Sequence, residues 1–581
     1  MKLSDFVASY LESKGIRVIY GYIGGMITHL VDSITSNTQV RFVQTYHEQT
    51  AAIAAEGYAL ESGKFGVAIS TSGPGATNMI TGIADAYFGS IPVLYITGQV
   101  NTYEYKYDKP LRQQGFQETD IVRIVTPITK YAKFIDCAED IKYELDKALN
   151  IALTGRKGPV LLDLPMDIQR AEIDSNKLRG YEIPGLSTNV IKNWDEIEEI
   201  IFTAKRPLLL LGAGCNGCDV DLLEQIIYKY QWPVVTSLLG RGIINENYKN
   251  YIGMLGAYGH RCANMSIPKT DVLIVLGSRL DTRQTGAMID AFLQTGRIIH
   301  VDIDELELDN HRLKNRISVL CSVDDFINKL ASSGGTRTID YSLWNKYLGK
   351  LKEKYNQDEE IERFVANKAP YRFMQCMNTI MKEDDTVCVD IGQNQMWAAQ
   401  TLKLKSKQSF ITSGGLAPMG FSMPVAIGCA FANPNKTIYS INGDGGFHMA
   451  SQSLMLISQY NLPIKVIVMN NHSLGMITQF QHLYFNDKMP ATTLYGGYCV
   501  PQIEQIAKAY SLKYFKLDEK NITDAALLET IIVSRNCIVE YVIEGLTSVS
   551  PKLEFDKPIS RPTPLLPVEE YEMYMKIDDR D

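Results

Sequence analysis

Two apolar segments, residues 437–441 and 464–469, are each followed by a polar cluster, and this pairing restricts the fold more than any other feature of the chain. The first cluster is Gly-Asp-Gly at 443–445, and the second is Asn-Asn at 470–471. Apolar runs of this length are typical of buried parallel strands, and the roughly helix-length stretch between them completes a strand, helix, strand unit. Both clusters then lie at the carboxyl ends of strands, where open α/β sheets bind ligands.

The residue types in these clusters suit magnesium diphosphate. Gly443 and Gly445 let the backbone approach a phosphate, while the Asp444 carboxylate and the Asn471 amide oxygen are hard ligands for magnesium. Diphosphate oxygens and water can complete the octahedron around the ion. Either cluster alone is equally compatible with an ordinary turn or strand-end cap. Their combination at this spacing predicts a magnesium diphosphate site.

Composition restricts the partners and the compartment. The net charge is -8, and lysine and arginine form no stripe suited to a phosphate backbone, so nucleic acid is not an expected partner. The longest apolar runs are far shorter than the roughly 18 residues that cross a bilayer, so no membrane association is expected. The amino-terminal segment lacks the apolar core of a signal peptide, which predicts a cytoplasmic location.

The ten cysteines are too sparse and irregular for a disulfide framework, so we expect them to be reduced and mostly in the core. Cys215 and Cys218 form a C-x-x-C pair. No second pair lies near it in the sequence, and it follows a strand and a glycine turn, so neither zinc binding nor redox chemistry is predicted.

The length of 581 residues predicts about three domains and a tail. Alternating strand and helix patterns predict three α/β domains with doubly wound parallel sheets, at 1–175, 190–335 and 365–548. The charged segment 350–362 is expected to be an exposed helix or connector. The tail, 549–581, is expected to wrap a surface or to be partly disordered. A polar stretch, 176–193, is predicted to be a linker. Further expected strands are 67–70, 93–97, 160–164, 207–211, 233–236, 272–276 and 298–303.

The GDG and NN pair resembles the thiamine diphosphate binding motif. Further segments, in order over almost the whole chain, resemble the acetohydroxyacid (acetolactate) synthase branch of thiamine diphosphate enzymes. They are Gly21-Tyr-Ile-Gly-Gly25, Tyr46-His-Glu-Gln49, Thr71-Ser-Gly-Pro-Gly75, Gly115-Phe-Gln-Glu118, Gly392-Gln-Asn-Gln-Met-Trp397, Thr412-Ser-Gly-Gly-Leu416, Met419-Gly-Phe421, Leu474-Gly-Met476 and Gln479-Phe-Gln481. The resemblance implies a pyrimidine-binding, a central nucleotide-fold and a diphosphate-binding domain.

The resemblance assigns to Glu48 the hydrogen bond to the pyrimidine ring of thiamine, which helps the cofactor lose its thiazolium proton. The alternative from the sequence alone is that Glu48 is an acid that the helix dipole favours in the first turn of a helix. Glu48 lies in the first domain, whereas Asp444 and Asn471 lie in the third. The resemblance therefore implies a homodimer or homotetramer whose subunits share each active site.

The resemblance also implies the remaining site residues. Met419 and Met476 would press the two cofactor rings into a bent conformer, although both could be ordinary core residues. Gly25, His47 and Gln117 are candidate catalytic residues, the last two as hydrogen-bond donors to a substrate oxyanion or simply as polar loop and helix residues. Ser473 is a third candidate metal ligand. The remaining candidate cofactor contacts are Pro74, Asn78, Gln393, Asn394, Gly415, Gly446, Leu474 and Gly475.

The central domain carries a glycine-rich string, Gly212-x-Gly214-x-x-Gly217, after an expected strand. NAD is not predicted, because the following strand end lacks the acid of a nicotinamide site. The resemblance suggests FAD instead, with an empty or remodelled fold as the alternative, since a family arginine is Thr126 here. The candidate FAD residues are Gly212, Ala213, Gly214, Gly277, Arg279, Asp281, Arg283 and Asp302.

The implied reaction is carboligation, in which a 2-keto acid such as pyruvate loses carbon dioxide and its two-carbon unit passes to a carbonyl acceptor. Phe116 and Phe480 are the candidate acceptor pocket. Phe480 replaces a family tryptophan and Asn394 a family histidine, so the acceptor is open. A nucleotide-linked keto sugar in surface polysaccharide biosynthesis is one alternative acceptor. Simple decarboxylation of a 2-keto acid, or a non-catalytic role, is also compatible with the sequence.

Overall fold

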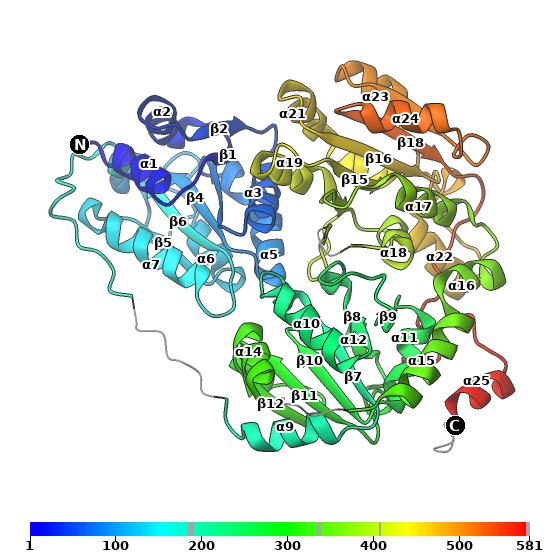
Figure 1. Cartoon of the computed structure of the whole chain (residues 1–581). Helices are drawn as coiled ribbons and strands as arrows, with labels where there is room; N and C mark the ends of the chain where they lie inside the picture. The colour runs from blue at the N-terminus through cyan, green and yellow to red at the C-terminus, as the bar shows by residue number, and fades with distance from the viewer. Residues whose placement is uncertain (184–190, 334–338, 406–407, 577–581) are drawn as a thin grey trace.

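The computed structural model describes residues 1–183, 191–333, 339–405 and 408–576. They form three sheets of six parallel strands, which follow one another along the chain and are flanked by helices (Figure 1). This confirms the predicted α/β class with three parallel-sheet domains. No helix in the described ranges is both long and apolar enough to cross a membrane.

The first sheet has the strand order β2-β1-β3-β4-β6-β5. Its strands are β1 (Val18–Tyr22), β2 (Arg41–Gln44), β3 (Gly66–Ser70), β4 (Val93–Gln99), β5 (Tyr131–Phe134) and β6 (Val160–Pro165). Its helices are α1 (Leu3–Ser13), α2 (Thr28–Asn37), α3 (Glu48–Ser62), α4 (Pro74–Asn78), α5 (Ile80–Gly89), α6 (Ile121–Val125), α7 (Ile141–Leu153) and α8 (Met166–Arg170).

The central sheet has the order β12-β11-β10-β7-β8-β9. Its strands are β7 (Pro207–Leu211), β8 (Val234–Thr236), β9 (Tyr251–Met254), β10 (Val272–Leu276), β11 (Arg297–Asp302) and β12 (Arg316–Leu320). Its helices are α9 (Trp194–Thr203), α10 (Val220–Tyr230), α11 (Arg261–Ser266), α12 (Thr282–Thr285), α13 (Glu305–Asp309) and α14 (Val323–Ser333). The central strands β7 and β10 are buried on both faces, which explains their continuous apolar sequences.

The third sheet has the order β14-β13-β15-β16-β18-β17. Its strands are β13 (Thr386–Val389), β14 (Ser409–Thr412), β15 (Ile438–Gly443), β16 (Ile464–Asn470), β17 (Tyr514–Leu517) and β18 (Cys537–Val542). Its helices are α17 (Ala369–Ile380), α18 (Gln393–Thr401), α19 (Ser422–Ala432), α20 (Asp444–Met449), α21 (Leu454–Gln459), α22 (Gly475–Tyr484), α23 (Ile503–Ala509) and α24 (Ala525–Val533). Two short helices, α20 and α21, connect β15 to β16, in place of the single helix expected there.

The first and third domains share one hydrophobic core, in which α3 packs against α19. The two helix backbones approach closely at a glycine from each side. A Cβ atom on Gly57 would lie 2.0 Å from the Val425 carbonyl oxygen, and one on Gly428 would lie 1.9 Å from the Ala54 carbonyl oxygen. Because no side chain fits at either position, these glycines fix how the two domains meet.

Two buried acids lie beside this contact. Glu56 on α3 and Asp85 on α5 are almost fully buried, and the Ser413 hydroxyl of the third domain donates a hydrogen bond to Asp85 Oδ1. Neither Glu56 oxygen has a donor among the described residues, so the two carboxyls can form a hydrogen bond only when one is protonated. Burial raises the pKa of Asp85 to about 6 and raises the pKa of Glu56 well above its usual range.

We expect this acid pair to make the protein less stable as pH rises from about 4 through 6 and beyond. The folded state holds protons that the unfolded chain releases, so the free energy of unfolding falls with pH, for Asp85 by about 3 kcal/mol. Glu56→Gln keeps a donor for Asp85 but has no carboxyl group at position 56 to titrate. It should therefore reduce the fall in the free energy of unfolding between pH 5 and 8. Thermal unfolding at pH 5 and 8 measures it, with the exposed Glu529→Gln as control. Equal pH dependence in Glu56→Gln and wild type would refute the assignment.

The charged segment 350–362 is helical, which agrees with one of the two expectations, but it is exposed on its outer face only. It belongs to two helices, α15 (Ser342–Tyr355) and α16 (Gln357–Phe364), whose inner faces are buried. Glu360 forms a buried ion pair with Arg261, with 2.8 Å between Glu360 Oε2 and Arg261 Nε. The charge of Glu360 therefore has a partner on the central domain rather than in solvent.

The tail crosses the central domain. Ile559 and Leu566 are buried in the core cluster that contains β7 and β10 side chains. The helix α25 (Val568–Met575) is held by Glu570, which forms an ion pair with Arg363 and accepts a hydrogen bond from Tyr355. Residues 577–581 of the tail and 184–190 of the predicted linker lie outside the described residues.

Candidate active site

The GDG and NN clusters meet at one edge of the third sheet, because β15 and β16 are parallel neighbours paired from Ile438 with Ile464 to Gly443 with Met469. Asp444 begins α20 and is 2% exposed. Its Oδ1 accepts a hydrogen bond from the Tyr498 hydroxyl at 2.7 Å, whereas its Oδ2 is buried and has no partner among the described residues. Burial raises the pKa of Asp444. A buried carboxylate oxygen without a donor fits a bound cation.

Asn471 is oriented by a hydroxyl. Its Nδ2 donates to Thr547 Oγ1 at 2.8 Å, and its Oδ1 accepts the Ser473 backbone N–H at 3.3 Å. The Thr547 hydroxyl in turn donates to Gln393 Oε1 at 2.6 Å. The Ser473 carbonyl accepts the Gly475 N–H at 2.9 Å. The described residues contain no cluster of three or more His, Cys, Asp or Glu side chains that could hold a metal ion, so a cation at Asp444 would need further ligands such as amide oxygens.

Apolar side chains cover the GDG turn. A Cβ atom on Gly445 would lie 2.8 Å from Leu474 Cδ2 and 3.1 Å from Met419 Cε, so the structure brings both predicted residues to this turn. Met476 lies further from it, with its sulfur 3.5 Å from the Tyr258 hydroxyl of the central domain. Gly475 is enclosed by Gln393 Oε1, which would be 2.1 Å from an added Cβ.

A buried carboxylate, Asp390, ties the surrounding loops together. It follows β13 and accepts backbone N–H groups of Ile391, Gly420 and Ser422 at 2.7, 3.0 and 3.2 Å. A Cβ on Gly446 would lie 2.8 Å from Asp390 Oδ1, so the loop that carries Met419 is fixed beside the GDG turn.

The amino-terminal end of α18 lies at the same turn. Gln393 begins the helix, and Asn394 Nδ2 donates to the Asp390 carbonyl at 2.7 Å. Asn394 Oδ1 would be 3.2 Å from a Cβ on Gly443. Helix amino-terminal ends favour anions, so α18 supports the predicted diphosphate position. Gly415 lies apart from this turn and packs on Phe88 of α5.

Glu48 lies in a second group, on the first domain. It begins α3, is 6% exposed, and its Oε2 accepts a hydrogen bond from Asn78 Nδ2 at 2.9 Å. A Cβ on Gly75 would lie 3.3 Å from Glu48 Oε1, so the turn that starts at Pro74 encloses the carboxylate. The position of Glu48 is compatible with both roles considered for it, the acid that hydrogen-bonds the cofactor and the acid favoured by the helix dipole. It lies in the first turn of a helix and is also buried.

The remaining predicted residues of the first domain surround this group. His47 caps α3, because its Nδ1 accepts the Gln49 N–H at 3.1 Å. Gln117 has a positive φ of 64° and packs its Cβ beside Gly73. Phe116 is 80% exposed and Gly25 has open space around it. No hydrogen bond or ion pair among the described residues joins this group to Asp444 or its neighbours.

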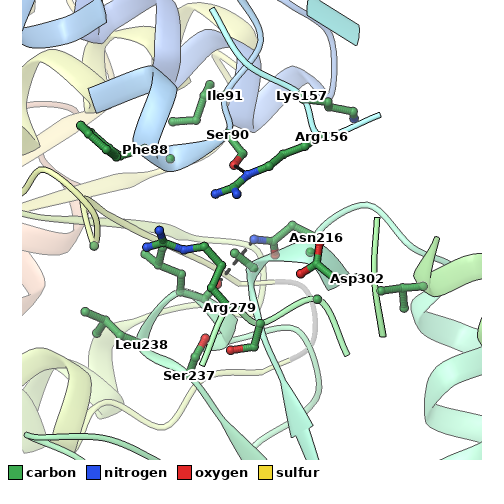
Figure 2. Close-up of a pocket in the computed structure, with 18 of the residues that line it drawn as sticks. Phe88, Ser90, Ile91, Arg156, Lys157, Asn216, Ser237, Leu238, Arg279 and Asp302 are labelled. Carbon is green, nitrogen blue, oxygen red and sulfur yellow. Dashed lines mark hydrogen bonds between the residues drawn. The ribbon is translucent and has the colours of Figure 1, made fainter. Parts of the chain in front are cut away.

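A cavity of about 660 Å³ lies between the first and central domains. Figure 2 shows Ser90 and Arg156 of the first domain on one side, facing Arg279 and Asp302 of the central domain. The ion pairs of Arg156 with Asp304 and Glu307, at 3.2 and 2.7 Å, join the two domains beside it. Seven of the eight predicted FAD residues line this cavity: Ala213, Gly214, Gly277, Arg279, Asp281, Arg283 and Asp302.

The glycine-rich turn forms the floor of this cavity. Gly212 lies beneath it, where an added Cβ would be 2.3 Å from the Gly277 carbonyl oxygen. Thr126 is exposed and does not line the cavity. Cys215 and Cys218 are free, and burial raises the pKa of the Cys218 thiol to about 11, which disfavours its thiolate form.

Three family descriptions match this chain in the order of its sheets. The N-terminal TPP binding domain of thiamine pyrophosphate enzymes matches residues 1–124, their central domain matches 194–330, and their C-terminal TPP binding domain matches 390–540. The chain belongs to the thiamine pyrophosphate enzyme family. The sequence-based resemblance is thereby confirmed.

Its similar relatives are acetolactate synthases. The large subunit from Lactococcus lactis subsp. lactis is 35% identical, over 95% of this chain and 94% of the relative. A probable large subunit from Methanocaldococcus jannaschii is 34% identical over 95% and 94%, and the isozyme 2 large subunit from Escherichia coli is 33% identical over 95% and 97%. This chain is thus an acetolactate synthase-like, thiamine pyrophosphate-dependent carboligase.

Sequence reasoning missed three residues of this site. Asp390 directly follows a buried strand, as Asp444 does, so the pattern of an apolar strand followed by an acid could have identified it. Tyr498 and Thr547 lie in irregular segments, and only the fold brings them to Asp444 and Asn471.

Proposed function

We propose that this enzyme binds thiamine diphosphate with magnesium, decarboxylates a 2-keto acid, most simply pyruvate, and transfers the two-carbon unit to a carbonyl acceptor. The observation that carries the proposal is the buried, unpartnered Asp444 Oδ2 beside Asn471 at the glycine-rich GDG turn. When bound, the cofactor would supply the carbon nucleophile that attacks the keto carbonyl of the substrate. Asp444 and Asn471, with Ser473, would hold the metal, and the Gln393 end of α18 would face the diphosphate.

Residues of this chain supply the rest of the chemistry. Glu48 would exchange a proton with the pyrimidine ring, while Asn78 holds its carboxylate in place. Because His47 Nδ1 accepts a backbone N–H, its neutral ring carries the proton on Nε2, which can donate to a substrate oxygen. Met419 and Leu474 would exclude water and pack on the cofactor rings.

We propose that two chains build each site, in a homodimer or homotetramer. Glu48 and Asp444 belong to separate groups within one chain, and the Glu48 group is bordered by exposed residues such as Phe116. A second chain placed against this face would bring its own Asp444 group to Glu48. The cytoplasmic location stays a prediction.

The acceptor is proposed to be a second pyruvate, with a nucleotide-linked keto sugar as the alternative. Phe480 supports the alternative acceptor, because it stands where the family has a tryptophan. Its ring packs with Tyr484 and Phe555, at centroid distances of 4.8 and 6.3 Å. The loss of the indole N–H removes one donor from the acceptor pocket. Incubation with pyruvate alone tests this: rapid acetolactate formation supports the first acceptor. Pyruvate loss that stays slow until a keto sugar is added supports the second.

We also propose that the cavity between the first and central domains binds FAD. Its volume lies in the range of cofactor sites, and the guanidinium groups of Arg283 and of Arg279, which also pairs with Asp281, are donors suited to a diphosphate.

We expect the purified protein to carry flavin, and Gly214→Ala to lose most of it. An added Cβ would lie 2.6 Å from Gly277 Cα, and such overpacking costs about 1–3 kcal/mol, or roughly tenfold or more in affinity. Flavin absorbance per chain measures the loss. Gly349→Ala is the matched control, because nothing lies within 4 Å of the new methyl group. Flavin retained equally by Gly214→Ala would argue against this site.

A further inference from the structure

The Tyr498 hydroxyl lies at the sheet edge that carries the candidate metal ligand Asp444. It donates to Asp444 Oδ1 at 2.7 Å, while Asp444 Oδ2 is buried and has no partner in the described part of the chain. One oxygen of the carboxylate is therefore occupied and the other is free. A hydrogen bond to one oxygen restricts the rotation of the carboxylate about its Cβ–Cγ bond, so it sets the direction in which the other oxygen points.

The hydroxyl also lies at the GDG turn itself. An added Cβ on Gly445 would be 3.2 Å from Tyr498 Oη, close to where Leu474 and Met419 also converge. Tyr498 is half-buried, whereas Tyr495 in the same loop is fully exposed. The loop thus presents one tyrosine to the site and one to solvent.

Backbone hydrogen bonds attach this loop to the residues that follow Asn471. Tyr498 N donates to the Thr493 carbonyl at 2.9 Å, and Thr493 pairs with Ser473 in an antiparallel bridge. Leu474 N donates to the Thr492 carbonyl at 3.0 Å. The segment 492–498 therefore contacts Asp444 through a side chain and Ser473 through its backbone, so it spans the two sides of the candidate metal site.

We propose that Tyr498 is a positioning residue that fixes the rotation of the Asp444 carboxylate, so that Oδ2 faces the cation. The proposal rests on the magnesium site proposed above. Partners that orient a metal ligand are typically worth 10–100-fold in metal affinity. Tyr498 should therefore set how tightly the protein binds magnesium, without contacting the substrate.

Tyr498→Phe removes only the hydroxyl, and Tyr495→Phe is the matched control. Calorimetric titration of each protein with Mg²⁺, at saturating thiamine diphosphate, should give a Kd about 10–100-fold weaker for Tyr498→Phe and unchanged for Tyr495→Phe. The Mg²⁺ concentration that gives half-maximal activity should rise by a similar factor for Tyr498→Phe and stay unchanged for Tyr495→Phe. Thermal unfolding without cofactor shows whether each variant folds.

The outcomes separate this inference from the proposed function. If the wild-type protein binds no Mg²⁺ with thiamine diphosphate, the proposed function fails. If it binds and Tyr498→Phe binds equally well, or loses kcat at saturating metal with an unchanged Kd, only the positioning role is overturned. If Tyr498→Phe does not fold, the positioning role is tested instead by amide hydrogen exchange of residues 492–498 in the wild-type protein, with and without Mg²⁺. Exchange should slow on adding Mg²⁺ to the thiamine diphosphate complex, and no change would overturn the role.

Discussion

Replacing Glu48 with glutamine should leave the fold intact and reduce turnover by about 10²–10⁴-fold. The side chain is buried at the start of α3 and its carboxylate is held by Asn78. Glutamine keeps the volume and can still accept that hydrogen bond, but it cannot carry the proton that the pyrimidine ring must exchange, and general acid–base catalysis contributes a factor of this size. The measurements are kcat with pyruvate and deuterium exchange at the bound cofactor.

The matched control for this substitution is Glu529→Gln, which makes the same chemical change at an exposed position on α24. Both variants should unfold at temperatures close to that of the wild type. A Glu48→Gln enzyme with full activity would show that Glu48 is only an acid favoured by the helix amino-terminal end.

Asp444→Ala should weaken the binding of the cofactor and leave the catalytic steps on the bound cofactor possible. It removes the one buried carboxylate of the proposed metal site, so we expect magnesium-dependent binding of thiamine diphosphate to weaken by about 100-fold or more, since a lost charged ligand costs several kcal/mol. Thermal unfolding with and without magnesium and cofactor measures this, because a ligand that binds only the folded state raises the unfolding temperature.

Asp384→Ala is the control, since this exposed acid lies in the same domain but precedes β13. It should show the full cofactor-induced rise in unfolding temperature, and Asp444→Ala should show little. Partial recovery of Asp444→Ala activity by excess cofactor and metal would agree with a binding role. An undiminished rise in Asp444→Ala would exclude Asp444 as a metal ligand.

The parts of the fold that were predictable have local causes. The bounds of β7 and β10 match the predicted 207–211 and 272–276, because strands buried on both faces are apolar without interruption. Asp444 and Asn471 were singled out because each directly follows a mostly apolar, buried strand. The parallel register then brings them together without any further information.

The parts that could not be predicted depend on contacts distant in sequence. Glu360 lies in a charged segment that is typical of a solvent-exposed surface, but its partner Arg261 lies 99 residues away in the sequence and is buried. Thr547 reaches Asn471 across 76 residues, and Tyr498 reaches Asp444 across 54. No periodicity marks Thr547 and Tyr498, because both lie in irregular segments that the tertiary fold brings to the sheet edge.

Carbon dioxide release from pyruvate labelled at its carboxyl carbon tests thiamine-dependent decarboxylation most directly. The purified wild-type protein is given pyruvate with thiamine diphosphate and Mg²⁺ together, with each alone, and with neither, beside Glu48→Gln. We expect labelled carbon dioxide only when both are present, and strongly reduced release by Glu48→Gln. Release that is independent of thiamine diphosphate, or no release from any 2-keto acid when the cofactor is bound, would contradict the proposed reaction.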